Sequence, residues 1–264
     1  MPVPAYHPLR MNLLAAFIFF TRLPFWRISE VPAECFKHVV PYWPLVGWLT
    51  GGISATVLWC CGQVMPLSTA WIIALISRLL VTGCLHEDGL ADFLDGFGGG
   101  TSRERILHIM KDSHIGTYGV IGLIIYFVLL YQLALLPLPL LCALTLCADC
   151  WSKCVASHLI HFLPYARKEE ESKAHVVYGR MRLGEELLAL SAGTLPLVAF
   201  LPAAYWPAIV TPLIPFGLLT LLMKRRIQGY TGDCCGALCL LCELTFLLTC
   251  LTIYTLIESI YTLI

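Results

Sequence analysis

The sequence contains few charged residues. Only 13% of its 264 residues are Asp, Glu, Lys or Arg, and 58% are apolar, whereas an average soluble domain has about 25% charged and about 45–50% apolar residues. Neither sign is in excess, since 17 basic residues balance 17 acidic ones. No bulk field therefore attracts nucleic acid, and the composition excludes a disordered chain and argues against an ordinary soluble enzyme.

The chain also lacks an internal repeat, a low-complexity segment and any sign of a second domain, so residues 1–264 are treated as one domain. Its 13 cysteines lack the loop-rich setting of a disulfide scaffold, and most lie in apolar runs where a thiol packs as a small hydrophobe. Two Cys-x-x-Cys pairs, Cys147/Cys150 and Cys239/Cys242, lie in such runs. There the spacing indicates one helix face rather than a zinc site.

Most charged residues lie in four stretches, at residues 1–40, 86–116, 163–186 and 224–243. Apolar runs separate these stretches, and the mean hydropathy is +0.79. A helix needs roughly 20 apolar residues to cross a bilayer, so we predict an all-α polytopic membrane protein with about seven transmembrane helices. The spans are placed near residues 41–65, 68–85, 117–137, 138–162, 187–205, 206–223 and 237–259.

Prolines mark tight joins between paired spans, at Pro66, Pro137, Pro139, Pro202 and Pro207. Three hairpins and a last single helix then place all four charged stretches on one face, with every Lys and Arg except Arg78 and Lys153. By the positive-inside rule this face and the N-terminus are cytoplasmic and the C-terminus is outside. We expect a multi-pass protein of the bacterial inner membrane, in contact with the lipid bilayer.

The N-terminal segment, residues 1–40, is predicted to be cytoplasmic or interfacial. Its apolar stretch 11–26 is too short and too interrupted to span a membrane, and it lacks the small-residue cleavage site of a signal peptide. We predict an interfacial helix there.

The densest chemistry lies in residues 86–100. Asp88, Asp92 and Asp95 are spaced i, i+4 and i+7, which stacks three carboxylates on one helix face about 5–6 Å apart. Oxygen ligands at this density suit Mg²⁺ bound together with substrate phosphates. The alternative is a solvated acidic helix start. His86 is a candidate general base or orienting group, or else a structural histidine.

Two glycines interrupt this acidic helix. Gly89 and Gly96 each lower helix propensity by about 1 kcal/mol. We interpret them as places where the backbone closely approaches a bulky ligand.

A basic segment follows the acidic cluster. Cations beside a metal and carboxylate site are what phosphate oxygens need, although an ordinary positive-inside flank would look similar. The candidate phosphate-binding or substrate-binding residues of this segment are Arg103, Arg105, Lys111, Asp112 and Ser113.

A second candidate element is the glycine-rich turn that holds Thr231 and Asp233. Asp233 is expected to supply a metal ligand or to bind a hydroxyl, and Glu243 lies deep enough in the last span to need a partner. Asp149 and Lys153, at i and i+4, form a pair that neutralises itself. We interpret that pair as structural, with a phosphate-facing Lys153 as the alternative.

Several motifs together resemble the cobalamin synthase family, the adenosylcobinamide-GDP ribazoletransferases. The resemblance also includes Phe20-Thr21-Arg22-Leu23-Pro24 and Pro44-Leu45-Val46-Gly47, and so covers nearly the whole chain. Gln228, where the family usually has glycine, and Lys153, where arginine is usual, are mild departures. The main motifs are His86-Glu87-Asp88-Gly89-Leu90-Ala91-Asp92-Phe93-Leu94-Asp95-Gly96, Arg103-x-Arg105-x-x-x-x-Met110-Lys111-Asp112-Ser113-x-x-Gly116-x-x-Gly119 and Gly229-x-Thr231-Gly232-Asp233-x-x-Gly236-Ala237.

The resemblance implies a Mg²⁺-dependent transfer at the cytoplasmic face of the inner membrane, late in cobalamin synthesis. A ribose hydroxyl of α-ribazole, or of its 5′-phosphate, attacks the cobinamide-bearing phosphate of adenosylcobinamide-GDP, and GMP leaves. On this hypothesis Asp88, Asp92 and Asp95 hold Mg²⁺, and one of them or His86 accepts the hydroxyl proton. The number of metal ions, and association into a homo-oligomer or with other enzymes of the pathway, are left open.

In the same hypothesis Arg105 and Lys111 bind phosphate, while Asp112 and Asp233 add metal or ribose contacts. The nearest rivals are another Mg²⁺-dependent membrane diphosphate transferase, either a CDP-alcohol phosphotransferase or an aspartate-rich prenyltransferase. A transporter would place ionisable residues near the middle of its spans, and a scaffold would need no ordered set of acidic residues and glycines.

Overall fold

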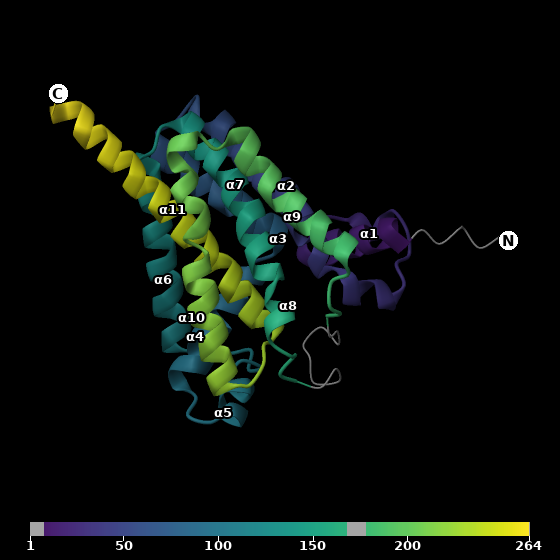
Figure 1. Cartoon of the computed structure of the whole chain (residues 1–264). Helices are drawn as coiled ribbons and strands as arrows, with labels where there is room; N and C mark the ends of the chain where they lie inside the picture. The colour runs from purple at the N-terminus through teal and green to yellow at the C-terminus, as the bar shows by residue number, and fades with distance from the viewer. Residues whose placement is uncertain (1–7, 168–177, 264) are drawn as a thin grey trace.

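The computed structural model describes residues 8–167 and 178–263, and within these ranges the chain is built from helices (Figure 1). In these ranges the backbone also forms one isolated β-bridge, between Tyr165 and Tyr230. The all-α prediction is confirmed. The helices are α1 (Pro8–Phe20), α2 (Trp43–Gly62), α3 (Leu67–Thr82), α4 (Leu85–Gly99), α5 (Arg103–Ile109), α6 (Thr117–Tyr131), α7 (Leu138–Ser157), α8 (Leu159–Phe162), α9 (Leu183–Phe200), α10 (Leu213–Arg226) and α11 (Gly232–Leu263).

Six helical segments in the described ranges are long and apolar enough to cross a membrane, or up to seven if one bent pair counts as a span. The number agrees with the prediction of about seven spans. The six segments are Val40–Gly62, Thr117–Leu135, Leu138–Phe162, Leu183–Phe200, Ala203–Arg226 and Gly232–Thr262.

The predicted boundaries of the spans differ most from the structure at the bent pair, α3 and α4. The span expected at 68–85 ends at Thr82, and the chain turns by 88° into α4. Two successive residues at the turn, Gly83 and Cys84, have φ of 64° and 58°. This left-handed backbone stops α3, and α4 starts in a new direction with its carboxylates packed against the bundle.

The N-terminal apolar stretch forms the short helix α1, which lies beside the bundle at the right of Figure 1. At 13 residues it is shorter than the roughly 20 residues that a span requires. Its predicted interfacial position stays a prediction.

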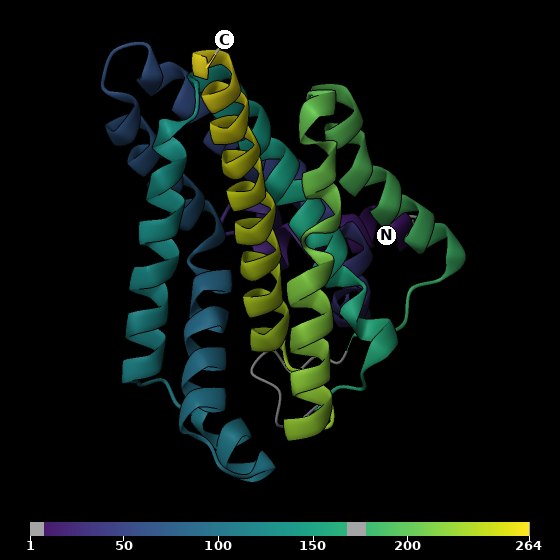
Figure 2. The same cartoon turned by 60° about the vertical axis from the view of Figure 1, so that its left-hand side comes forward.

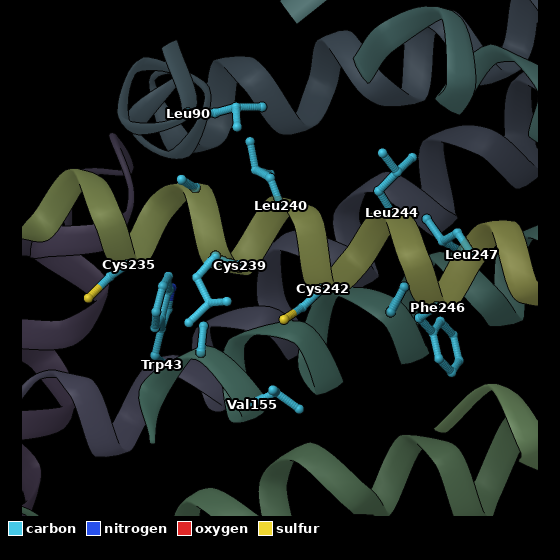
Figure 3. Close-up of a cluster of buried hydrophobic side chains, with 14 of the residues drawn as sticks. Trp43, Leu90, Val155, Cys235, Cys239, Leu240, Cys242, Leu244, Phe246 and Leu247 are labelled. Carbon is cyan, nitrogen blue, oxygen red and sulfur yellow. The ribbon is translucent and has the colours of Figure 1, made fainter. Parts of the chain in front are cut away.

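The last helix, α11, is the centre of the core. It packs mainly on α4 and α7, and Figure 2 shows it between α6 and α10. Leu240 points toward Leu90 of α4, whereas Cys242 faces the side of α7 that carries Val155 (Figure 3). Both thiols of each Cys-x-x-Cys pair are buried, and the described cysteines form no disulfide. They pack as small apolar side chains, as predicted.

Two ion pairs are buried in the helix bundle, one between helices and one within α7. Arg78 of α3 bonds the carboxylate of Glu243 on α11, and the hydroxyl of Tyr126 donates to the same carboxylate at 3.1 Å. The partner that Glu243 was predicted to need is therefore Arg78. Lys153 and Asp149 pair directly within α7, and the Thr50 hydroxyl of α2 donates to Asp149. This confirms the predicted pairing.

Removing one member of the Arg78–Glu243 pair should destabilise the protein more than removing both. Arg78→Met or Glu243→Leu leaves a buried charge without its partner, and we expect each to cost roughly 3–5 kcal/mol, while the double variant recovers much of that loss. Unfolding of the purified protein by increasing SDS in mixed micelles measures the difference. A double variant as unstable as the sum of the single ones would contradict a direct pair.

Candidate functional site

The candidate site lies where the N-terminal ends of α4 and α11 touch. A Cβ added at Gly89 would lie 3.0 Å from the carbonyl oxygen of Asp233, and one at Gly236 would lie 3.3 Å from the Cα of His86. The two backbones are thus in contact because neither glycine has a side chain. The interpretation of Gly89 as a contact with ligand is wrong, since its face is occupied by α11.

The interpretation of Gly96 is corrected in the same way. A Cβ at Gly96 would lie 3.2 Å from the carbonyl oxygen of Ile106 on α5 and closer still to the Met110 side chain. Both glycines of α4 therefore serve helix packing, and a ligand is not required to explain them.

Beside the α4 and α11 contact lies a cavity of about 120 Å³, here called the aromatic cavity. It brings together three predicted site residues, His86, Asp88 and Asp233, and Arg167 from the segment after α8. Asp88 is exposed, whereas Arg167 is only 9% exposed. The full lining is Phe19, Phe20, Val40, Trp43, Leu85, His86, Asp88, Tyr165, Arg167, Tyr178, Gly232, Asp233, Cys235 and Gly236.

Asp233 lies in the first turn of α11, where the helix dipole favours a negative charge. Arg167 Nη1 is 3.9 Å from Asp233 Oδ2, and Nη2 donates to the carbonyl of Leu107 at 3.0 Å. The buried Thr231 hydroxyl accepts from the backbone N–H of Cys234 at 3.3 Å. Thr231 thus supports the turn that presents Asp233.

His86 is buried at the start of α4. Its ring stacks on Trp43, with centroids 5.5 Å apart and 12° between the planes, and within the described residues its Nε2 has no hydrogen-bond partner. A buried nitrogen without a partner needs an explanation, and a ligand in the adjoining cavity is one. Its predicted role as a general base stays a prediction.

Asp95 has a different environment at the other end of α4. Its two carboxylate oxygens accept hydrogen bonds from the N–H groups of Gly116 and Gly119 at 2.7 and 2.8 Å. Asp95 therefore caps the N-terminus of α6. The backbones of these two glycines approach its carboxylate closely.

A second, polar cavity of about 340 Å³ lies beside Asp95. Among the predicted residues it is lined by Asp95, Arg105 and Asp112. Hydrogen bonds from the His114 side chain and backbone hold the pKa of Asp112 below its usual value. The full lining is Asp95, Gly99, Arg105, His108, Ile109, Asp112, His114, Gly116, Thr117 and Tyr118.

The remaining predicted residues lie outside both linings. The Arg103 guanidinium donates to the carbonyls of Ile227 and Ala166 at 2.9 and 2.7 Å, so it joins two connecting segments. Lys111 and Ser113 are exposed. Gln228, where glycine was expected, has a φ of 56°, a left-handed conformation that glycine adopts without cost.

The three carboxylates of α4 are spread over two helix turns. Asp88 and Asp95 are seven residues apart, which is about 10 Å along a helix, and the described residues contain no group of three or more His, Cys, Asp or Glu side chains placed to hold a metal. Asp88 and Asp92 are one turn apart. Mg²⁺ usually takes one or two carboxylates and completes its shell with water and substrate phosphate, and the spacing of this pair suits that arrangement. Asp88 lines the aromatic cavity, whereas Asp92 is 8% exposed and lies outside both linings.

Sequence reasoning missed Arg167 and the aromatic lining. Arg167 lies in a charged stretch, where its charge looked like any other positive-inside residue. Trp43 is more than a hundred residues from Tyr165 and Tyr178 in the sequence. Only their shared cavity distinguishes them from ordinary apolar residues.

The fold and the site define a polytopic membrane protein whose acidic and basic residues converge at helix ends. The chain belongs to the cobalamin-5-phosphate synthase family, whose sequence profile matches residues 12–251. It is 39% identical over 246 residues to the adenosylcobinamide-GDP ribazoletransferase of Shewanella woodyi, covering 90% of this chain and 95% of the relative. It is 37% identical over 247 residues to that of Shewanella amazonensis, covering 92% and 95%. No solved structure matches the chain.

A side chain at position 89 should disturb the contact between α4 and α11. Gly89→Val brings a side chain against backbone atoms that cannot rotate away, so we expect a loss of roughly 1–3 kcal/mol of stability. Gly217→Val on α10 is the matched control, because a Cβ there meets nothing within 4 Å. Thermal unfolding of detergent-solubilised protein compares them, and equal midpoints for the two variants would contradict the contact.

Proposed function

We propose that this chain transfers the adenosylcobinamide-phosphate group of adenosylcobinamide-GDP to α-ribazole or α-ribazole 5′-phosphate and releases GMP, a late step of cobalamin biosynthesis. The observation that carries the proposal is the family match over residues 12–251. This range contains both α4 and the start of α11, whose carboxylates Asp88 and Asp233 line one cavity. The rival CDP-alcohol and prenyl substrates are not favoured, because the matched relatives are adenosylcobinamide-GDP ribazoletransferases.

In this reaction a ribose hydroxyl oxygen forms a bond to the cobinamide-bearing phosphorus, and the bond from that phosphorus to the bridging oxygen breaks. That oxygen leaves with GMP, and the hydroxyl proton passes to a base. Phosphoryl transfer depends mainly on positioning and on neutralising charge. Mg²⁺, when bound, would supply that neutralisation at the diphosphate.

The carboxylates of α4 provide the oxygen ligands for this chemistry. Asp88 and Asp92, one turn apart, are the pair we assign to Mg²⁺. Asp95, the third predicted ligand, holds the N-terminus of α6, and its role as a metal ligand stays a prediction. Either a carboxylate or His86 accepts the hydroxyl proton.

Cationic side chains lie at both ends of α4. Arg167 is placed against Asp233 in the aromatic cavity, and Arg105 lines the polar cavity with Asp112. We assign phosphate binding to these two arginines, with Lys111 as an exposed cation nearby in sequence. Arg103 and Thr231 support the connecting segments around the site, and Ser113 stays a predicted substrate-binding residue.

The direct test is loss of a metal ligand. Asp92→Ala should lower GMP release from adenosylcobinamide-GDP and α-ribazole 5′-phosphate by more than about 100-fold, since even outer partners of metal ligands are worth about 10–100-fold. Membranes containing equal amounts of each variant provide the assay. Glu258→Ala, at an exposed site on α11, should leave the rate unchanged. Normal turnover by Asp92→Ala would refute the assignment.

The site is proposed to face the cytoplasm of a bacterial inner membrane, because the charged stretches share one face. An impermeant maleimide should then label Val64→Cys, in the exposed turn between α2 and α3, in intact spheroplasts. Lys224→Cys, at the end of α10, should be labelled only after lysis. Each variant is compared with the parent chain, which already contains exposed Cys60 and Cys84. Labelling of both variants from the same side would contradict this topology.

A further inference from the structure

The aromatic cavity contains more flat rings than phosphate chemistry needs. Phe20 and Trp43 stack with centroids 5.0 Å apart and 8° between the planes, and His86 lies nearly parallel to Trp43 at 5.5 Å and 12°. These three rings come from α1, α2 and α4. They form a platform of parallel planes, and parallel planes favour a ligand that is itself a flat ring.

Two nitrogen atoms of this platform are unsatisfied. Trp43 is 2% exposed and His86 is 4% exposed, and in the described part of the chain neither Trp43 Nε1 nor His86 Nε2 has a hydrogen-bond partner. Burying a polar group without a partner is costly. A ligand with a ring nitrogen would relieve this cost at either position.

Two tyrosines complete the lining. Tyr178 meets Phe19 edge to face, with centroids 6.2 Å apart, and Tyr165 meets Tyr230 in the same way at 5.3 Å. Tyr165 and Tyr178 also line a neighbouring cavity with His161 and Arg180. The aromatic cavity thus has ring walls, while its charged groups are Asp88, Arg167 and Asp233.

We propose that the aromatic cavity binds the benzimidazole ring of α-ribazole. This inference rests on the proposed function and identifies where the acceptor lies. The ring stacks on the face of Phe20 or His86 and lies level with Trp43, whose in-plane Nε1–H donates a hydrogen bond to its unsubstituted nitrogen. The attached ribose then lies beside Asp88 and Asp233, the carboxylates assigned to the reaction.

The chemistry of the lining favours this ring over the other groups of the two substrates. A corrin macrocycle is several times the size of a benzimidazole and carries polar amide side chains, which walls made mostly of aromatic side chains would leave without partners. Guanine carries several donors and acceptors on its edge and needs a partner for each. The methylated carbon edge of the benzimidazole needs none, which suits walls made of phenylalanine, tryptophan and tyrosine. His86 in this arrangement is a positioning residue, and a carboxylate accepts the proton.

The test compares the KM values for the two substrates in membranes containing the full chain. Trp43→Phe keeps a flat ring and removes the Nε1 donor, and Tyr178→Leu removes a ring from the wall. We expect each to raise the KM for α-ribazole about ten-fold, the upper scale of one hydrogen bond for Trp43→Phe and the scale of base–aromatic stacking for Tyr178→Leu. The KM for adenosylcobinamide-GDP should stay within about two-fold. Tyr261→Leu, exposed near the end of α11, is the matched control and should change neither.

A rise in the KM for adenosylcobinamide-GDP, with weaker inhibition by GMP and an unchanged KM for α-ribazole, would place guanine in the cavity and overturn the inference. Unchanged KM values for both substrates would also overturn it.

Turnover by the wild-type chain supports the proposed function, so that the KM values of the variants then test the cavity alone. If wild-type membranes release no GMP, equilibrium dialysis with α-ribazole decides the cavity alone. Binding that weakens in Trp43→Phe supports the inference, and absence of binding to wild-type protein overturns it.

Discussion

The structure depends on the contact between α4 and α11 at Gly89 and Gly236. Because no side chain separates the two backbones there, the start of the acidic helix lies directly against the start of the last helix. The 88° turn after α3 aims α4 at this contact. The buried Arg78 then links three helices, since it pairs with Glu243 of α11 and lies 3.6 Å from Glu87 of α4. In a low-dielectric interior, a fully paired charge network favours one arrangement of the helices that carry its members.

This constraint explains how residues far apart in the sequence form one site. The aromatic cavity is lined by His86 and Asp88 of α4, by Asp233 of α11 and by Arg167 from the segment after α8. Asp95, at the other end of α4, fixes α6 and the polar cavity. In the proposed reaction, such a surface lets the phosphates stay hydrated while the aromatic base is buried. The family match covers all of these elements.

Much of this architecture could be predicted from the sequence, because membrane helices are recognised locally from length and hydropathy. The acidic residues of α4 were recognised from their spacing, and the partner of Glu243 was expected because a buried carboxylate needs one. The turn at Gly83 and Cys84 was missed because apolar residues continue to its edge. Gly89 was misread because its partner, the backbone of Asp233, is more than a hundred residues away. Trp43 and Tyr178 can be recognised as cavity residues only from their neighbours in the folded structure.

The measurement that tests the central claim most directly is GMP release by membranes containing the wild-type chain, with Mg²⁺ or with EDTA. Adenosylcobinamide-GDP and α-ribazole 5′-phosphate are supplied together and singly. The account predicts release only when both substrates and Mg²⁺ are present. Absence of release from protein shown to be folded, or release that EDTA leaves unchanged, would contradict it.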